Sequence, residues 1–300
     1  MGLRGTLPPE LGSLSQLRTL SVHDNGMDGP VPPAFGKLRQ LEVLDLGGNL
    51  FSGPLPSLLA QLASTLQTLD LTGYRFEGPI PSVVGKLTSL RYLILERADG
   101  SGRIPSFLAK LEKLLVLNLR SSLFTGSIPS FLRKLKSLEQ LDLSDSSKLT
   151  GSIPSSLGEL KCLQRLDLSR ISQLTGSIPK SLGDLQNLEY LDLSVTMLSG
   201  SIPPSLGKLA SFETLKISGT NVAGRCPDTL GNLKKLKVLD LSFNRGMHGP
   251  IPSSFGQFAS LEELWLSGAG LTGQIPSSLG RLSKLVKLDI SSNSFSGSIP

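Results

Sequence analysis

Apolar residues recur along the chain with a period of 24 or 25 residues. Each period contains an L-x-x-L-x-L segment, as in Leu41 to Leu46, in which every second residue of the core is apolar. Such alternation is typical of a short strand with one buried face. The pattern, which opens at Leu17 and last occurs from Leu285, therefore predicts twelve short strands with leucines inward and variable residues outward.

A second pattern, Gly-x-apolar-Pro, separates these segments. Its glycine lies at positions 5, 29, 53, 78, 102, 126, 151, 176, 200, 224, 249, 273 and 297. Glycine permits a positive φ, and proline fixes φ and has no N–H to donate, so the chain is predicted to bend there. The next segment, such as Pro154 to Leu160, spaces its leucines by three, which favours a single 3₁₀ or α turn. Each period thus predicts one turn of a coil that buries its leucines by stacking on its neighbours.

The complete unit, as in Leu41 to Pro56 and Leu285 to Pro300, resembles the plant-type leucine-rich repeat LxxLxLxxNxLxGxIP. The resemblance covers essentially the whole chain. It implies an α/β fold: a right-handed leucine-rich repeat solenoid (horseshoe) with a parallel concave β-sheet and short 3₁₀/α turns on the convex side. We expect residues 1–300 to form one domain of about twelve repeats.

The ends of the chain differ from extracellular members of that family, which carry paired cysteines in caps and follow a signal peptide. Leu3 to Pro8 is already the second half of a repeat, and Pro300 falls on a repeat boundary. We therefore interpret the chain as a fragment lacking both caps and expect its exposed apolar ends to cause self-association.

The family also places an inward asparagine after each strand, whose amide hydrogen-bonds adjacent turns. The resemblance assigns this structural asparagine ladder to Asn25, Asn49, Asn244 and Asn293. The equivalent positions elsewhere hold Tyr74, Ala98, Ser122, Ser146, Ile171, Thr196, Thr220 and Ala269. Hydroxyl groups recover part of this bonding, whereas Ala and Ile recover none, so the middle repeats are expected to be less rigid.

Composition narrows the function classes. Aromatic residues make up 5% of the chain and hydrophobic residues 39%, so the core must be aliphatic. The net charge is +6, yet no block of like charges exceeds Lys234 to Lys237, and nucleic-acid binding is not expected. No apolar stretch is long enough for a membrane span. Cys162 and Cys226 fall on turns too far apart for a disulfide, which predicts two free thiols.

The sequence gives little support for a catalytic function. Aspartates recur at one outward strand position, where adjacent carboxylates at about 5 Å could serve a glycosidase. Because this column repeats with the consensus, we interpret it as a solvated acidic stripe: Asp45, Asp70, Asp142, Asp167, Asp192, Asp240 and Asp289. His23 and His248 lie on distant turns, and the start Met1 to Thr6 matches a myristoylation pattern by coincidence of repeat phase. No enzyme activity, metal site or cofactor is predicted.

Larger side chains break the otherwise small outward surface of the predicted concave face in two clusters. The first contains Tyr92, Ile94, Glu96, Arg97, Asn118 and Arg120. The second contains Tyr190, Lys216, Phe243, Glu263 and Trp265. Exposed Trp, Tyr and Arg are enriched in interface hot spots, although single exposed aromatics are also common without a partner. We expect Trp265, with Phe243 as a second anchor, to be the principal ligand contact.

The resemblance therefore implies a non-enzymatic recognition module of a plant receptor-like protein or kinase that binds a protein or peptide ligand on its concave face, with a co-receptor as a further partner. A soluble extracellular inhibitor of cell-wall hydrolases is the alternative. A structural or ice-binding solenoid fits less well, because the outward columns vary. Family resemblance implies an extracellular or cell-surface location, while the lack of an Asn-x-Ser/Thr sequon keeps an intracellular one open.

Overall fold

The structure, a computed structural model, describes residues 2–76 and 78–298. The chain divides into two compact units, Met1–Leu149 and Thr150–Pro300, called unit 1 and unit 2 here. The single domain expected for residues 1–300 stays a prediction, and Pro300, the expected repeat boundary, lies outside the described residues.

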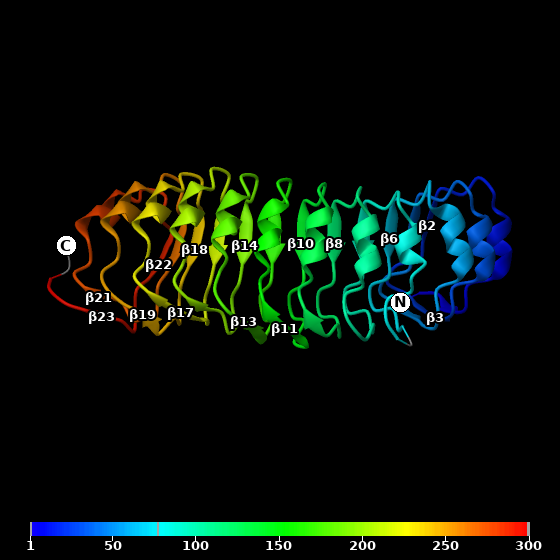
Figure 1. The fold of residues 1–300 in the computed structure, drawn as a ribbon, viewed down its shortest axis with the longest axis horizontal. Helices are drawn as coiled ribbons and strands as arrows, with labels where there is room; N and C mark the ends of the chain where they lie inside the picture. Colours follow the sequence, from blue (N-terminus) through cyan, green and yellow to red (C-terminus); the bar gives the residue numbers. More distant parts are fainter. Residues whose placement is uncertain (1, 77, 299–300) are drawn as a thin grey trace. The chain divides into compact units, whose positions relative to one another are not determined.

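Each unit contains a main sheet of short parallel strands joined in sequence order (Figure 1). In unit 1 the main sheet consists of β2 (Thr19–Ser21), β4 (Val43–Asp45), β6 (Thr68–Asp70), β7 (Tyr92–Ile94), β8 (Val116–Asn118) and β10 (Gln140–Asp142). In unit 2 it consists of β12 (Arg165–Asp167), β14 (Tyr190–Asp192), β16 (Thr214–Lys216), β18 (Val238–Asp240), β20 (Glu263–Trp265) and β22 (Lys287–Asp289). The strands lie where the L-x-x-L-x-L segments predicted them.

Smaller parallel pairings join the segments that precede the Pro steps. Unit 1 has β1 (Arg4–Gly5), β3 (Gly26–Gly29), β5 (Leu50–Phe51) and β9 (Gly126–Ser127). β11 (Leu149–Ser152) begins at the last residue of unit 1 and pairs with β13 (Gln173–Thr175), and unit 2 continues with β15 (Ser199–Gly200), β17 (Asn221–Gly224), β19 (Gly246–Met247), β21 (Thr272–Gly273) and β23 (Ser294–Phe295). Both ladders of a turn are therefore parallel, as a stacked coil requires.

Short 3₁₀ turns connect each Pro step to the next main-sheet strand. In unit 1 they are η1 (Pro9–Ser13), η2 (Pro33–Lys37), η3 (Ser57–Leu62), η4 (Val84–Lys86), η5 (Ser106–Lys110) and η6 (Ser130–Lys134). In unit 2 they are η7 (Ser155–Glu159), η8 (Lys180–Asp184), η9 (Pro204–Lys208), η10 (Asp228–Asn232), η11 (Ser253–Gln257) and η12 (Ser277–Arg281). The alternation of parallel strand and 3₁₀ turn confirms the predicted coil.

The core of each unit is a stack of leucines. The central leucine of an inner strand, such as Leu44 or Leu191, is fully buried, and so is a leucine of the following 3₁₀ turn, such as Leu59 or Leu206. Apolar side chains are exposed in the first and last turns, among them Leu3, Leu14, Val286 and Leu288. The self-association expected from such ends stays a prediction.

One residue in each turn adopts a positive φ three positions after the end of the main-sheet strand. Glycine holds this place in four turns, at Gly48, Gly73, Gly219 and Gly268. Other residues accept the left-handed conformation there, including the β-branched Val195 at φ 59° and Phe243 at φ 57°. Because side chains other than Gly and Asn rarely adopt this conformation, these two residues store backbone strain at the edge of the sheet.

The asparagines assigned to the structural ladder all hydrogen-bond the backbone. Asn244 is fully buried; its Nδ2 donates to the carbonyls of Ile217 and Leu241, and its Oδ1 accepts from Thr220 N–H at 3.0 Å. Asn25, Asn49 and Asn293 make equivalent bonds. Where serine replaces the amide, at Ser122 and Ser146, the hydroxyl donates to one carbonyl of an earlier turn, that of Leu95 or Leu119, at 3.2 Å. The Thr196 hydroxyl donates instead to the Leu193 carbonyl of its own turn.

Both cysteines are free, as predicted. Cys162 is exposed beside the start of β12, whereas Cys226 is buried in the place of the Ile of the Gly-x-Ile-Pro step. Burial raises the pKa of the Cys226 thiol, so it stays protonated and unreactive.

Candidate functional site

The aspartates at the strand ends have a structural role that the sequence analysis did not predict. In each of them Oδ1 accepts the backbone N–H two residues later; the acceptors are Asp45, Asp70, Asp142, Asp167, Asp192, Asp240 and Asp289. The carboxylate therefore fixes the turn that follows the strand. The interpretation as a solvated stripe is wrong for Asp167 and Asp192, which are only 6% and 8% exposed.

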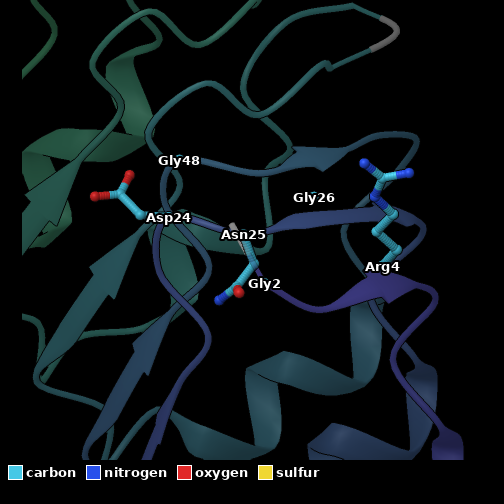
Figure 2. Close-up of a pocket in the computed structure, with 6 residues that line it drawn as sticks. All are labelled: Gly2, Arg4, Asp24, Asn25, Gly26 and Gly48. Atoms are coloured by element: carbon cyan, nitrogen blue, oxygen red, sulfur yellow. The ribbon is translucent and has the colours of Figure 1, made fainter.

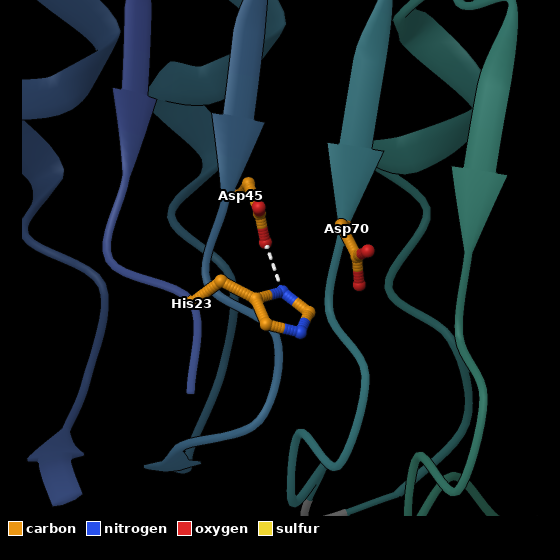
Figure 3. A group of neighbouring side chains, drawn as sticks. All are labelled: His23, Asp45 and Asp70. Atoms are coloured by element: carbon orange, nitrogen blue, oxygen red, sulfur yellow. Dashed lines mark hydrogen bonds and ion pairs between the residues drawn. The ribbon is translucent and has the colours of Figure 1, made fainter. Parts of the chain in front are cut away.

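Unit 1 places two of these carboxylates side by side with a histidine. Asp45 and Asp70 are in register on β4 and β6, and His23 extends toward them from the turn after β2 (Figure 3). His23 Nδ1 lies 2.8 Å from Asp45 Oδ1, and one ligand atom from each of the three residues lies within 4.8 Å of the others. This cluster was missed in the sequence because its members come from three turns.

The charges of this cluster shift two pKa values. The hydrogen bond that His23 donates to Asp45 raises the pKa of His23, and the negative charges of Asp24 and Asp70 add to the effect. Burial raises the pKa of Asp70, and the negative charge of Asp45 acts in the same direction, although Thr72 donates two hydrogen bonds to the carboxylate. The pair therefore carries unfavourable negative charge that His23 compensates only when it is protonated.

Unit 2 has a second in-register pair, Asp167 and Asp192 on β12 and β14. Arg165 supplies its positive charge: a guanidinium N–H donates to Asp167 Oδ2 at 2.9 Å, and the guanidinium carbon lies 3.6 Å from the Tyr190 ring centroid. The Tyr190 hydroxyl donates to Asp192 Oδ2 at 3.2 Å. Burial, with the charges of Asp192 and Asp167, raises the pKa of Tyr190 to about 12.

Trp265 stands at the strand-end position between Asp240 and Asp289, as the sequence predicted. Its indole is half-buried, and Nε1 donates to Glu263 Oε2 at 3.0 Å. Lys287 Nζ donates to the other Glu263 oxygen at 2.7 Å and lies 5.9 Å from the indole centroid. The bonds from Lys287 and Trp265 lower the pKa of Glu263. Lys287, which was absent from the predicted cluster, is therefore a direct neighbour of Glu263 and Trp265.

The other predicted members of the second cluster are dispersed. Phe243 is 62% exposed in its left-handed turn, and its ring lies against Gly268; no ring contact with Trp265 occurs within residues 2–76 and 78–298. Lys216 lies two strands from Trp265, with Asp240 between them. Tyr190 belongs to the Arg165 network rather than to the surface around Trp265.

The first predicted cluster is held together by polar contacts within unit 1. Asn118 Nδ2 donates to Glu96 Oε2 at 3.3 Å, and Arg97 approaches the other Glu96 oxygen at 3.9 Å. Arg120 Nε donates to Asp145 Oδ2 at 3.2 Å. Beside these residues lie Tyr92, 39% exposed, and the half-buried Ile94 on β7. The cluster presents an aromatic ring next to charges that are already paired.

A hollow at the edge of unit 1 is lined by Gly2, Arg4, Asp24, Asn25, Gly26 and Gly48 (Figure 2). Its central amide is fully engaged, because Asn25 Oδ1 accepts Leu3 N–H and Nδ2 donates to the Val22 and His23 carbonyls. Arg4 and Asp24 lie on opposite sides of it (Figure 2). The hollow therefore lacks convergent free polar groups, and it is a weaker candidate than the sheet surface.

Family comparison agrees with the repeat. A model described as Leucine-rich repeat region matches residues 64–199 and 156–299, and a Leucine Rich Repeat model matches residues 16–38 and 40–62. The chain belongs to the leucine-rich repeat proteins, and the predicted fold class is confirmed. No curated protein sequence matches the chain.

Solved structures similar to the chain include plant receptors and a plant ice-binding protein. The plant peptide hormone receptor RGFR1, in complex with RGF2, is 35% identical with a TM-score of 0.91; the match covers 99% of this chain and 47% of that receptor. The TDR receptor is 35% identical with a TM-score of 0.91, covering 99% of this chain and 51% of that one. A plant ice-binding protein is 27% identical with a TM-score of 0.69, covering 93% and 81% of the two chains. The chain spans about half the length of the two receptors.

Proposed function

We propose that the chain is the ligand-recognition part of a plant cell-surface receptor and that it binds a peptide without catalysing a reaction. The observation that carries the proposal is the similarity, at 35% identity across 99% of this chain, to a receptor whose structure contains the peptide hormone RGF2. Leucine-rich repeat proteins of this receptor type are usually not enzymes. Among the described residues no helix has the length and apolarity to cross a membrane.

We place the ligand contact on the solvent-facing side of the main sheet in unit 2, around Trp265. Three features support this position: a large half-buried ring replaces the strand-end aspartate, Glu263 and Lys287 offer paired opposite charges beside it, and Lys216 adds a positive charge nearby. An apolar anchor surrounded by polar groups is the usual anatomy of a recognition hot spot. The competing interpretation is that Glu263 and Lys287 merely hold the indole on the sheet.

The test is a binding titration with synthetic RGF2, AtPEP1 and IDA, the peptides bound by structurally similar receptors. Trp265→Ala should cost about 2 kcal/mol of binding free energy if the ring is a hot spot, whereas Lys134→Ala, on the exposed η6 turn, should leave the affinity unchanged. Equal affinity of wild type and Trp265→Ala, with unchanged circular dichroism, would move the site to the cluster around Tyr92 and Arg120. Binding of none of the three peptides would count against a peptide-hormone role.

Two other functions remain as alternatives. Similarity to a plant ice-binding protein favours one of them, although that activity needs a flat repeated array, and here Trp265, Lys216 and Ile94 interrupt the aspartate column. Thermal hysteresis of a purified sample tests it. Inhibition of a fungal polygalacturonase by the chain would instead support the extracellular inhibitor.

A further inference from the structure

We propose that His23, Asp45 and Asp70 form a binding site for a divalent transition-metal ion such as Zn²⁺. The three side chains come from successive turns of unit 1 and converge on the solvent-facing side of its main sheet (Figure 3). Their ligand atoms already lie within 4.8 Å of one another. Zinc–ligand bonds of about 2.1 Å place tetrahedral donors about 3.4 Å apart. Side-chain rotations that move the ligand atoms by roughly 1 Å would therefore complete the geometry.

Gly47 makes this convergence sterically feasible. It occupies the position after β4 that corresponds to His23 after β2, and it is buried beneath the imidazole. A Cβ added to Gly47 would lie 2.7 Å from His23 Nδ1 and 2.9 Å from Asp70 Oδ1. The imidazole and the carboxylate therefore lie over the space that any other side chain would fill. The close approach of both side chains to Gly47 is a separate observation from the hydrogen bond between His23 and Asp45.

The balance of charge also favours a cation. The otherwise equivalent pair in unit 2, Asp167 and Asp192, is neutralised by the chain's own Arg165 at 2.9 Å. At Asp45 and Asp70 no Lys or Arg lies within ion-pair distance in the described part of the chain; the only basic partner is His23. An external divalent ion would supply the positive charge that a guanidinium supplies in unit 2.

The donor set decides the kind of ion. Mg²⁺ and Ca²⁺ prefer sites made wholly of oxygen, whereas an imidazole nitrogen with carboxylate oxygens suits Zn²⁺ and its neighbours in the first transition row. Zinc binds an imidazole through a nitrogen that carries no proton, so binding at His23 Nδ1 would replace the hydrogen bond between this nitrogen and Asp45. Three protein ligands leave one coordination position open to water or to a donor from a bound molecule.

The experiment is a calorimetric titration of the tag-free chain with ZnCl₂, in wild type and in a Cys162→Ser background, because the exposed thiol is a competing ligand. His23→Gln, Asp70→Asn and Gly47→Ala are the test variants, and Gly47→Ala keeps all three donors. Matched controls are His248→Gln, Asp240→Asn and Gly78→Ala, the last at a glycine where an added Cβ meets nothing within 4 Å.

We expect one Zn²⁺ per chain with micromolar affinity in both backgrounds, a loss of about tenfold or more in each test variant, and unchanged affinity in the controls. Circular dichroism checks folding, and Gly47→Ala and His23→Gln decide the outcome if Asp70→Asn unfolds.

Absence of saturable binding, unchanged affinity in the test variants, or binding that disappears with Cys162→Ser alone would overturn the proposal. Binding of a lysine homopolymer to this cluster without binding of Zn²⁺ would assign it to a basic ligand instead. Peptide binding at Trp265 in unit 2 is a separate measurement, so either result can fail alone.

Discussion

The two in-register aspartate pairs show how one repeat position acquires different chemistry. Asp167 and Asp192 are nearly buried, and Arg165 and Tyr190 satisfy the carboxylate oxygens that face the sheet surface. Asp45 and Asp70 are more accessible and have a histidine in place of an arginine. The backbone role of the four carboxylates is the same, since each accepts the N–H two residues later.

The difference lies in the side chains beside the pairs. Arg165 is on the same strand as Asp167, so its guanidinium reaches the carboxylate and stacks on the next strand's ring. In unit 1 the corresponding place on β4 is Val43, which offers no charge. A pair supplied with its own cation is a structural element, and a pair without one is open to an external cation.

Removing the cation of the unit 2 pair should have the largest effect on stability. Arg165→Met leaves Asp167, whose side chain is 9% exposed, without its ion pair. Because Arg165 itself is 38% exposed, we expect a cost of about 2 kcal/mol, below that of a fully buried pair. The midpoint of urea unfolding, followed by circular dichroism, measures it.

The control is Arg18→Met, which removes the exposed Arg18–Glu42 pair and should cost about 0.5 kcal/mol or less. The double variant Arg165→Met/Asp167→Asn should recover part of the loss. Equal destabilisation by Arg165→Met and Arg18→Met would show that the unit 2 pair gains nothing from its cation.

The ionisation of Tyr190 reports the same network. Its pKa of about 12 exceeds the ordinary value of about 10, so the folded chain holds the phenolic proton more tightly than the unfolded chain does. This contribution is complete below about pH 10 and is lost as the pH rises through 12. An ultraviolet absorbance titration of wild type should show a phenolate transition near pH 12 that is absent in Tyr190→Phe. If the transition that Tyr190→Phe removes lies near pH 10, the network does not hold the phenolic proton.

Neutralising one carboxylate should affect the stability of the chain differently in the two pairs. Asp70→Asn removes repulsion from Asp45, and its amide oxygen can still accept from Thr72, so stability at pH 7 in the presence of EDTA should stay unchanged or rise by up to about 0.5 kcal/mol. Asp192→Asn weakens the bonds from Ser194 and Tyr190 and should cost about 1 kcal/mol. Thermal unfolding of both variants gives the comparison, and a loss at Asp70 as large as that at Asp192 would refute it.

The smallest effect is expected in the turns that follow the pairs. Three residues after Asp70 the left-handed position holds Gly73, and three residues after Asp192 it holds Val195. Val195→Gly should relieve the strain of a β-branched residue at φ 59°, partly offset by the greater freedom of glycine in the unfolded chain, for a net gain of about 0.5 kcal/mol. Thermal unfolding should show an increased midpoint for Val195→Gly and a decreased one for Gly73→Val.

The period of the sequence was sufficient to predict the fold. Alternating leucines such as Leu44 and Leu46 defined the strands, and the Gly-x-apolar-Pro steps defined the bends, because both depend on local backbone preferences and on which face is buried. The same period placed Trp265 between Asp240 and Asp289, since equal positions in successive turns must be neighbours in a parallel sheet.

The chemistry of the sheet surface depended on tertiary structure. Lys287 and Glu263, which are 24 residues apart, are hydrogen-bonded between adjacent turns. His23 lies close to Asp70 because Gly47, in the turn between them, has no side chain that would occupy this space. These contacts depend on rotamers and on the size of a side chain in the intervening turn, which a repeat pattern does not specify. The sequence by itself determined where each side chain emerges from the backbone. The packing between turns decided which charged groups are paired. A long polar side chain has several possible partners at similar distances, and the local space and charge determine which contact forms.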